Sequence, residues 1–241
     1  MTSLEAELER ARDLDVSELA EAVESIGFEC TRCGACCKAE TACGATTEGT
    51  AEDGAATKDP HTATVFPGEV RDLLDATGPE YDWRDVARPM PYGLDDDADG
   101  GETFEWALQV DDCGDCTFYE ERDGEGACTV HGDRPLICRT YPFSIGSLTG
   151  EAGGAGTTEP MGGVVDREGP VRGHECEGLG RDISRGDAED LAAALKRRAI
   201  RELEEAIGVR DSYRPVDAEG VVVHDSEGQK RADGTAIERD E

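Results

Sequence analysis

The chain has 241 residues, of which 37% are hydrophobic and only 5% aromatic, so it can build one substantial domain with a modest core. Its net charge of −32 comes from 56 acidic against 24 basic residues, and four of the latter are lysines, so nucleic-acid binding through a basic patch is not expected. An acidic surface poor in lysine instead indicates adaptation to a very salty cytoplasm, because salt screens the repulsion between like charges.

The first predicted elements are helical. Apolar side chains recur at helical spacing through residues 2–26, and possible capping boxes begin at Thr2 and Asp15. Two short helices broken near 13–15 are therefore favoured over one long helix. This start lacks the cationic and then apolar pattern of a signal peptide, and no stretch reaches the roughly 18 apolar residues of a membrane span. The sequence predicts a cytoplasmic protein without a membrane segment.

The next segment crowds cysteines together. FECTRCGACCKAE, at 28–40, places four of them within eight positions: Cys30, Cys33, Cys36 and Cys37. A CxxC spacing lets two thiolates turn onto one metal ion, and thiolates favour zinc, cuprous copper and iron–sulfur clusters. Four thiolates complete one tetrahedral zinc site or bind one iron–sulfur cluster. Because adjacent Cys36 and Cys37 point in different directions in most backbone conformations, they could serve different metals, or one could ligate while the other supports.

The middle of the chain alternates loops with short elements. Residues 40–60 are small and polar without apolar periodicity, which predicts an insertion. A short helix should begin at Pro67 and end at Gly78. Residues 103–110 alternate apolar side chains as a single strand does, and 116–130 read as a hairpin around the turn RDGEG.

The last part of the chain contains the longest predicted helix. A second low-complexity insertion covers about 148–162, and the helix spans about 187–207, with Asp187 as its cap and Gly208 as its end. The fold class is α+β: one small metal-organised domain with long loops, N-terminal helices, a short antiparallel hairpin and a C-terminal helix. The expected divisions are an N-terminal helical segment, a cysteine-cluster metal-binding domain, and a weak hairpin with an acidic tail: 1–27, 28–210 and 211–241.

The remaining cysteines also follow a pattern. Ten cysteines in a reducing compartment favour metal binding or redox chemistry over a disulfide framework, although an isolated cysteine is often just a buried, inert thiol. Cys43, inside the first insertion, is expected to be such a bystander, and Cys113 is left open as a ligand. The other cysteines lie in CGDC, across the predicted hairpin, in RPLICRTYPF and in HECEGLG: Cys116, Cys128, Cys138 and Cys176.

RPLICRTYPF contains three candidate cofactor-binding residues beside Cys138. Two prolines flank the cysteine and would hold its sulfur in place. The charges of Arg134 and Arg139 could offset the negative charge of several thiolates, or they could form ordinary ion pairs with the many acidic residues. Tyr141 could donate its hydroxyl to a cluster sulfur or to a substrate, or it could simply pack with Phe143 over the site.

These motifs, taken in order, resemble the YkgJ-like family of cysteine-cluster proteins from Phe28 to about Gly180. The matching motifs are CxxCxxCC, C-x-F, a cysteine across a short turn, RPxxCRxYPF and CxGxG. The resemblance implies a protein that chelates zinc or iron and that is often labelled an iron–sulfur oxidoreductase. Cys43 and Cys113 lie outside the pattern. The resemblance implies eight metal ligands: Cys30, Cys33, Cys36, Cys37, Cys116, Cys128, Cys138 and Cys176.

The four histidines receive separate predictions. His131 stands where relatives usually have an aromatic residue, and we expect it to be a solvated turn residue, with extra metal ligation as the alternative. His174 precedes Cys176 by two positions and could also approach a metal. We expect His61 and His224 at the surface.

The leading hypothesis is an iron-binding or iron–sulfur protein with a redox role, such as an oxidoreductase with a redox partner protein. A non-catalytic binding module stapled by zinc is the rival. A third hypothesis is methyl transfer supported by a cluster, since the flagellin lysine-N-methylases carry a similar cysteine cluster, although nothing here resembles their additional length. The radical S-adenosylmethionine CxxxCxxC, HExxH, GxSxG and P-loop motifs are missing, and no substrate follows from the sequence.

Overall fold

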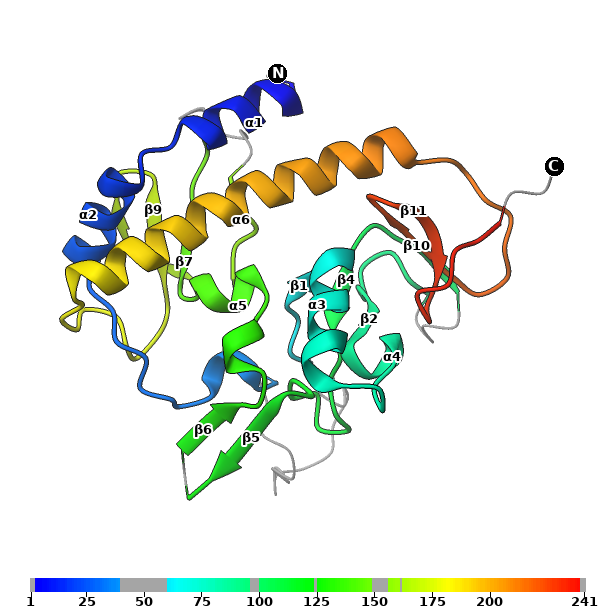
Figure 1. The fold of residues 1–241 in the computed structure, drawn as a ribbon, viewed down its shortest axis with the longest axis horizontal. Helices are drawn as coiled ribbons and strands as arrows, with labels where there is room; N and C mark the ends of the chain where they lie inside the picture. The colour runs from blue at the N-terminus through cyan, green and yellow to red at the C-terminus, as the bar shows by residue number, and fades with distance from the viewer. Residues whose placement is uncertain are drawn as a thin grey trace, which may run out of the picture.

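The computed structural model describes residues 3–39, 60–95, 100–123, 125–148, 156–160 and 162–238. Within these ranges the chain forms six α-helices and four small sheets, arranged along one long helix, α6 (Figure 1). The fold is therefore mixed α+β, as predicted. Cys43 and most of the two predicted insertions, 40–60 and 148–162, lie outside the described residues.

Two short helices begin the fold, as the sequence predicts. They are α1 (Leu4–Asp13) and α2 (Val16–Ile26). Asp15 separates them because its carboxylate accepts hydrogen bonds from the backbone N–H groups of Ser17 and Glu18, at 2.7 and 3.1 Å. Ser3 caps α1, whereas Thr2 lies outside the described residues.

The long helix α6 (Arg185–Ser212) forms the spine of one half of the molecule, with α1 and α2 packed along it (Figure 1). The apolar faces of these helices enclose one hydrophobic core together with strands β7 and β9. The predicted helix ends are wrong. Ser184 provides the cap, and Gly208 lies inside the helix. Ser226 packs against Gly208 and leaves no room for a side chain, since an added Cβ would lie 2.6 Å from the Ser226 Cβ.

A second core lies in the other half, beneath helices α3 and α4. The helix predicted from Pro67 to Gly78 is confirmed as α3, which Pro67 begins and Gly78 ends. The core packs these helices on an antiparallel sheet of order β1-β4-β2, around Trp106 and Phe118. The bounds are Pro67–Thr77 for α3, Trp83–Val86 for α4, Thr64–Val65 for β1, Trp106–Leu108 for β4 and Ala87–Pro89 for β2.

The prediction of one strand over 103–110 is wrong. The chain bends at Phe104, so β3 and β4 belong to different sheets, and β3 instead runs parallel to β10 of the C-terminal hairpin. Phe104 stacks on His224, with 5.1 Å between ring centroids, and His224 is fully buried rather than at the surface. The bounds are Gly101–Thr103 for β3, Val221–Asp225 for β10 and Gly228–Arg231 for β11.

The remaining strands are β5 to β9, and the short helix α5 comes between β6 and β7 in the chain. The predicted hairpin is confirmed as β5 and β6, which extends from the body of the molecule, and β7-β9-β8 forms an antiparallel sheet beside α2 (Figure 1). The bounds are Tyr119–Arg122 for β5, Glu125–Cys128 for β6, Leu136–Thr140 for α5, Phe143–Ile145 for β7, Val164–Glu168 for β8 and Val171–His174 for β9.

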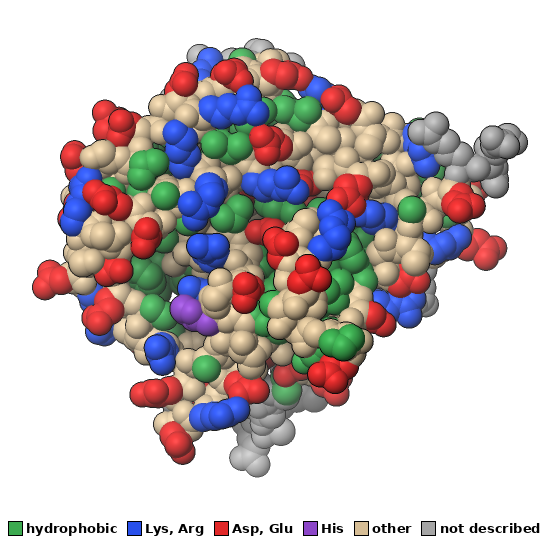
Figure 2. Space-filling view, viewed as in Figure 1, with side chains coloured by type: hydrophobic (Ala, Val, Ile, Leu, Met, Phe, Trp, Pro, Cys, Tyr) green, Lys and Arg blue, Asp and Glu red, His purple; other side chains and the backbone are tan. Residues whose placement is uncertain are grey.

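Charged side chains cover the face shown in Figure 2, where Lys and Arg are interspersed among Asp and Glu. Many of these charges are paired across elements, such as Arg210 of α6 with Glu5 of α1 at 2.7 Å. In the part of the chain that is described, no helix combines the length and the apolar composition that crossing a membrane requires.

Candidate metal centre

Eight cysteines with free thiols lie within the described residues, and they come from five separate parts of the chain. They are the segment after α2, the turn before β5, the end of β6, helix α5 and the turn after β9. These thiols are the same ones that the family resemblance implies: Cys30, Cys33, Cys36, Cys37, Cys116, Cys128, Cys138 and Cys176. Cys113, by contrast, is disulfide-bonded and does not belong to this set.

The segment that carries the first four thiols is tied down at both ends. At its start, Glu29 donates its backbone N–H to the carbonyl of Gly178 at 3.0 Å, which brings Cys30 beside the Cys176 turn. Further on, Gly126 of β6 donates to the carbonyl of Arg32 at 2.8 Å, and at the end of the segment Cys116 donates its backbone N–H to the carbonyl of Cys37 at 2.8 Å. The cysteine segment therefore bridges two distant elements, which explains how separate parts of the chain share one site.

Gly34 makes the turn that separates the CxxC pairs. Its φ of 76° is left-handed, and it precedes a single 3₁₀ turn, η1 (Ala35–Cys37). An added Cβ there would lie 2.3 Å from the Tyr119 hydroxyl, so the close approach of β5 also requires glycine. After this turn the sulfurs of Cys36 and Cys37 lie 3.8 Å apart.

Two adjoining hollows separate the thiols. The inner cavity has a volume of about 70 Å³ and is mostly apolar, with Leu108, Phe118 and Ile137 among its walls. The described residues that line it include no Asp or Glu, although the chain has 56 acidic residues. The thiols that line the inner cavity are Cys36, Cys37, Cys116, Cys128 and Cys138.

The second hollow, the outer pocket, measures about 430 Å³ and reaches solvent where Cys30 and Cys33 are exposed. His131 and Glu175 also line it. The thiols that line the outer pocket are Cys30, Cys33, Cys36, Cys138 and Cys176.

Backbone N–H groups support three of the sulfurs. In each case the N–H belongs to the residue two positions after the cysteine, and a hydrogen bond of this kind favours the thiolate. Gly178 donates to Cys176 at 3.4 Å, and the corresponding groups of Phe118 and Val130 lower the pKa of Cys116 and Cys128. Repeated N–H support for sulfur suits thiolates that carry charge in a metal complex.

Burial acts in the opposite direction on the free thiols. It raises the pKa of Cys116 to about 12 and raises the pKa of Cys128, Cys138 and Cys176 as well. The hydrogen bond between Cys36 and Cys37 raises the pKa of Cys36. These thiols therefore stay protonated at neutral pH in the free protein, and metal binding must release their protons.

The three candidate cofactor-binding residues lie around the thiols in different ways. Arg134 lines both hollows, and its charge only partly offsets the burial that raises the pKa of Cys128 and Cys138 and the Cys37 hydrogen bond that raises the pKa of Cys36. Arg139 lines the outer pocket. Tyr141 also lines both hollows, but its hydroxyl donates to the carbonyl of Glu175 at 2.8 Å, and burial raises its pKa.

The histidines are placed unexpectedly. His61 is buried, at 4% exposure, so the surface prediction is wrong. It lines the inner cavity, and its Nδ1 is buried without a hydrogen-bond partner among the described residues. Burial lowers the pKa of His61 to about 4, so the ring is neutral. A weak signal was in the sequence: His61, Ala63 and Val65 alternate with two threonines in the segment that leads into β1, and all three are buried, although Thr64 is buried too.

His174 and His131 differ from His61. His174 is fully buried, and its two ring nitrogens contact the Ser144 hydroxyl at 2.8 Å and the Gly162 carbonyl at 3.0 Å. This engagement leaves neither nitrogen open to a metal. His131 lines the outer pocket and is exposed, in keeping with a turn residue near the site.

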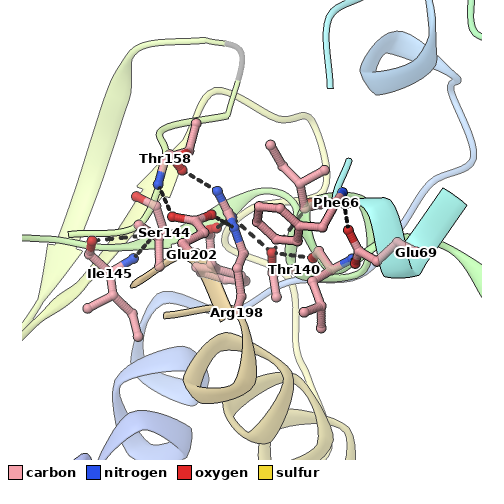
Figure 3. A network of polar contacts seen from close by, with 12 residues as sticks. Phe66, Glu69, Thr140, Ser144, Ile145, Thr158, Arg198 and Glu202 are labelled. Atoms are coloured by element: carbon pink, nitrogen blue, oxygen red, sulfur yellow. Dashed lines mark hydrogen bonds and ion pairs between the residues drawn. The ribbon is translucent and has the colours of Figure 1, made fainter. Parts of the chain in front are cut away.

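Helix α5, which carries Cys138, is fastened on two sides (Figure 3). At its start, Glu69 of α3 accepts hydrogen bonds from the backbone N–H groups of Leu136 at 2.8 Å and Phe66 at 3.1 Å. At its end, Arg198 of α6 donates to the Thr140 hydroxyl at 3.0 Å. These contacts fix the helix, and with it the backbone position of Cys138.

The donor set matches zinc or iron in its chemistry, since soft thiolates dominate it and the inner cavity is free of carboxylates. Among the described residues, however, no three Cys, His, Asp or Glu side chains are already arranged to hold a metal ion. The sulfurs surround the hollows without forming a closed coordination shell. Metal binding therefore requires the sulfurs to move inward.

Comparison with known proteins gives one match. Residues 29–177 match the model of the CxxCxxCC family, whose description is "Putative zinc- or iron-chelating domain". No curated protein and no solved structure matches the chain. The matched residues contain the eight free thiols of both hollows and also His61.

Proposed function

The chain belongs to the CxxCxxCC family of zinc- or iron-chelating domains, and we propose that its thiols carry iron, as an ion or an iron–sulfur cluster, in a redox role. One observation carries this proposal: eight free thiols from five parts of the chain meet at two adjoining hollows, the inner of which is apolar. Iron held by thiolates can accept or release single electrons, with a potential that depends on nearby charge and solvent exposure.

The exposure of two thiols argues against a zinc staple alone. A structural zinc site is closed, whereas Cys30 and Cys33 are exposed. The described residues also form two hydrophobic cores, and the core around α6 includes no cysteine among them. A staple is therefore not required for the half of the molecule that α6 organises.

The residues around the thiols have defined tasks in this proposal. Arg134 offsets the charge of thiolates in both hollows, since it lies between them. The apolar wall of the inner cavity limits the access of water to the buried thiol of Cys116. The exposed rim at Cys30 and Cys33 gives a partner protein a short path for electron transfer. Methyl transfer has no comparable support, because no observation points to a methyl donor.

The proposed setting is a salt-rich cytoplasm. The support is the net charge of −32 with only four lysines. Experiments on the protein should therefore be made in concentrated salt, where the repulsion between its charges is screened.

The test is anaerobic purification in multimolar salt, followed by metal analysis, a sulfide assay and a visible spectrum of one sample. Iron together with a brown colour that dithionite bleaches is the expected result, with acid-labile sulfide if a cluster is present. Stoichiometric zinc in a colourless sample would contradict the proposal and favour the staple. Cys128→Ser should lower the iron content, whereas Ala127→Ser, an exposed neighbour on β6, should not.

A further inference from the structure

We propose that the eight thiols form two separate metal centres: an inner one from Cys37, Cys116, Cys128 and Cys138 with His61 in its wall, and an outer one from Cys30, Cys33, Cys36 and Cys176. This inference rests on the proposed function, because it concerns the metals bound by the same thiols. It adds their number, their ligand sets and one histidine.

The first support is the way the thiols divide between the hollows. Cys37, Cys116 and Cys128 line only the inner cavity, whereas Cys30, Cys33 and Cys176 line only the outer pocket. The division leaves three thiols on each side before the shared ones are assigned. One shared thiol added to each side gives four thiolates, the complete set for one zinc ion or one iron–sulfur cluster.

The two shared thiols, Cys36 and Cys138, are assigned by packing. Cys138 packs against the core beneath α3 and α4, as Cys37 and Cys128 do, and Cys116 belongs to that core, so Cys138 joins the inner set. Cys36 is not among the described residues of that core and completes the outer set, whose pocket it lines.

The adjacent pair fits this division. Cys36 and Cys37 follow one another on the single 3₁₀ turn η1, where successive side chains point about 120° apart. Their sulfurs lie 3.8 Å apart, and Cys37 lines only the inner cavity. The adjacent cysteines of CxxCxxCC therefore lie between the two hollows, with Cys37 in the inner centre and Cys36 in the outer one.

His61 marks the inner cavity as a binding site independently of the thiols. Its backbone is fixed, because its N–H donates to the carbonyl of Gly114 at 2.7 Å and its carbonyl accepts from Arg88 at 3.0 Å. The ring is buried in the cavity wall, and its Nδ1 has no partner among the described residues. Buried nitrogens are rarely left unpaired, and a metal ion or its thiolate shell would provide the partner.

The experiment uses Co²⁺ as a probe, because its thiolate complexes are coloured. The full-length chain, with the disulfide of Cys113 kept intact, would be freed of metal without air, then titrated in multimolar salt and followed by visible spectra and metal analysis. The wild type should bind two equivalents. Cys30→Ser and Cys116→Ser should each keep one, with different spectra that together add up to that of the wild type.

Histidine variants test the inner centre further. His61→Phe should change only the spectrum that survives in Cys30→Ser, whereas His131→Phe, on the outer pocket, should leave that spectrum unchanged. If Cys116→Ser fails to fold, the exposed Cys30→Ser variant still decides the question, since it should keep one equivalent. Its native metal content after anaerobic purification gives a second count.

Three results would count against the inference. One equivalent of Co²⁺ in the wild type, or loss of all Co²⁺ from a folded Cys30→Ser variant, would mean a single centre. An inner spectrum that is unchanged in His61→Phe would remove His61 from the site. If the wild type binds no Co²⁺ and is isolated without metal, metal binding itself fails, which is a different outcome from one centre in place of two.

Discussion

The molecule has a helical half, built on α6, and a cysteine half, which comprises the core beneath α3 and α4 and the thiol-lined hollows. The two halves differ in whether their buried polar groups have hydrogen-bond partners. In the helical half, Arg198 is completely buried, and it donates to Glu202 at 2.7 Å, to the Thr140 hydroxyl at 3.0 Å and to the carbonyls of Phe143 and Thr158 (Figure 3). In the cysteine half, His61 is nearly as buried, yet its Nδ1 has no partner among the described residues. A satisfied network stabilises a fold, whereas an unsatisfied group in a thiol-lined cavity indicates a ligand site.

The histidines repeat the contrast. His174 and His61 are both buried near cysteines, but protein groups engage both ring nitrogens of His174. His174 precedes Cys176 in the sequence and seemed the better ligand candidate for that reason. The open Nδ1 of His61 beside the thiols therefore makes His61 the stronger candidate for the proposed inner centre.

Metal removal should have the largest effect and should separate the halves. Metal bound only in the folded state adds to the free energy of folding, by about 10–16 kcal/mol for zinc in small fingers. We expect chelation to raise hydrogen exchange in 28–39 and 116–130, while α6 keeps its protection because its core contains no cysteine. Hydrogen exchange by mass spectrometry measures both regions in one sample.

Two results would break this comparison. Equal loss of protection in both halves would make the metal a staple for the whole fold. A chelated protein that keeps its thermal transition and its near-ultraviolet signal would show that neither half depends on the metal.

Arg198→Ala should have the next largest effect, on the helical half. Removing one partner of a buried ion pair leaves the rest of the network unsatisfied and costs about 3–5 kcal/mol of unfolding free energy. Denaturant unfolding measures this loss. Arg197→Ala, an exposed neighbour on α6, is the matched control and should change stability by less than about 0.5 kcal/mol.

The metal content of Arg198→Ala tests how independent the halves are. Helix α5 keeps its hydrogen bond from Leu136 to Glu69 in this variant, so Cys138 should stay in position. We expect the folded variant to retain its metal. Loss of metal without unfolding would show that Arg198 positions Cys138 through Thr140.

Local signals predicted the elements that local contacts determine. The Asp15 cap located the break between α1 and α2, and Pro67 located the start of α3, because both act within one turn of helix. Gly208 was misread as a helix end. A glycine is needed there because Ser226, between β10 and β11, packs closely against it, and a contact between distant parts of the chain leaves no local signal in the sequence. The bend at Phe104 was missed for the same reason, since it depends on pairing between β3 and β10.

The site was predictable to a different extent. Cysteine motifs and the family resemblance named the eight thiols that prove to be free and gathered around the two hollows. Their division between two hollows follows from tertiary packing, which spacing does not reveal. His61 could have been found from its alternation with Ala63 and Val65, although a two-residue strand is a weak signal.

Gly34→Ala should have a smaller effect that is specific to the cysteine half. Gly180 is the matched control, because its φ of 74° is close to the 76° of Gly34 but an added Cβ there meets nothing within 4 Å. Gly180→Ala should cost about 1 kcal/mol from backbone strain. Gly34→Ala should cost about 1–3 kcal/mol more, since Tyr119 must move.

Denaturant unfolding and metal analysis of the two glycine variants together check this prediction. Metal occupancy should fall in Gly34→Ala, because the turn places Cys33 and Cys36, and should stay normal in Gly180→Ala. If both variants lost the same unfolding free energy and kept the same metal occupancy, the loss would come from left-handed backbone strain alone and not from the contact with β5.

A change of one pH unit should have the smallest effect. A rise in pH should lower the stability of the metal-free protein but raise the affinity of the protein for metal. In the free protein burial raises the pKa of Cys116 from 9.0 to about 12. A thiol whose pKa is higher in the folded state contributes stability that is complete below pH 9.0 and disappears as the pH rises through about 12. The metal-free protein should therefore become easier to unfold above pH 9.0.

Metal binding should show the reverse trend, because each buried thiol must lose its proton to become a ligand. Metal affinity should rise about tenfold per pH unit for each proton released, or about 1.4 kcal/mol. Competition between the protein and a chelator for Co²⁺, measured between about pH 6 and pH 8, gives this slope. In Cys116→Ser, which should keep only the outer centre, the slope should reflect only the protons released by the outer thiols. A slope near zero in the wild type would mean that the thiolates already exist in the free protein, and that backbone N–H groups and Arg134 outweigh burial in the cysteine half.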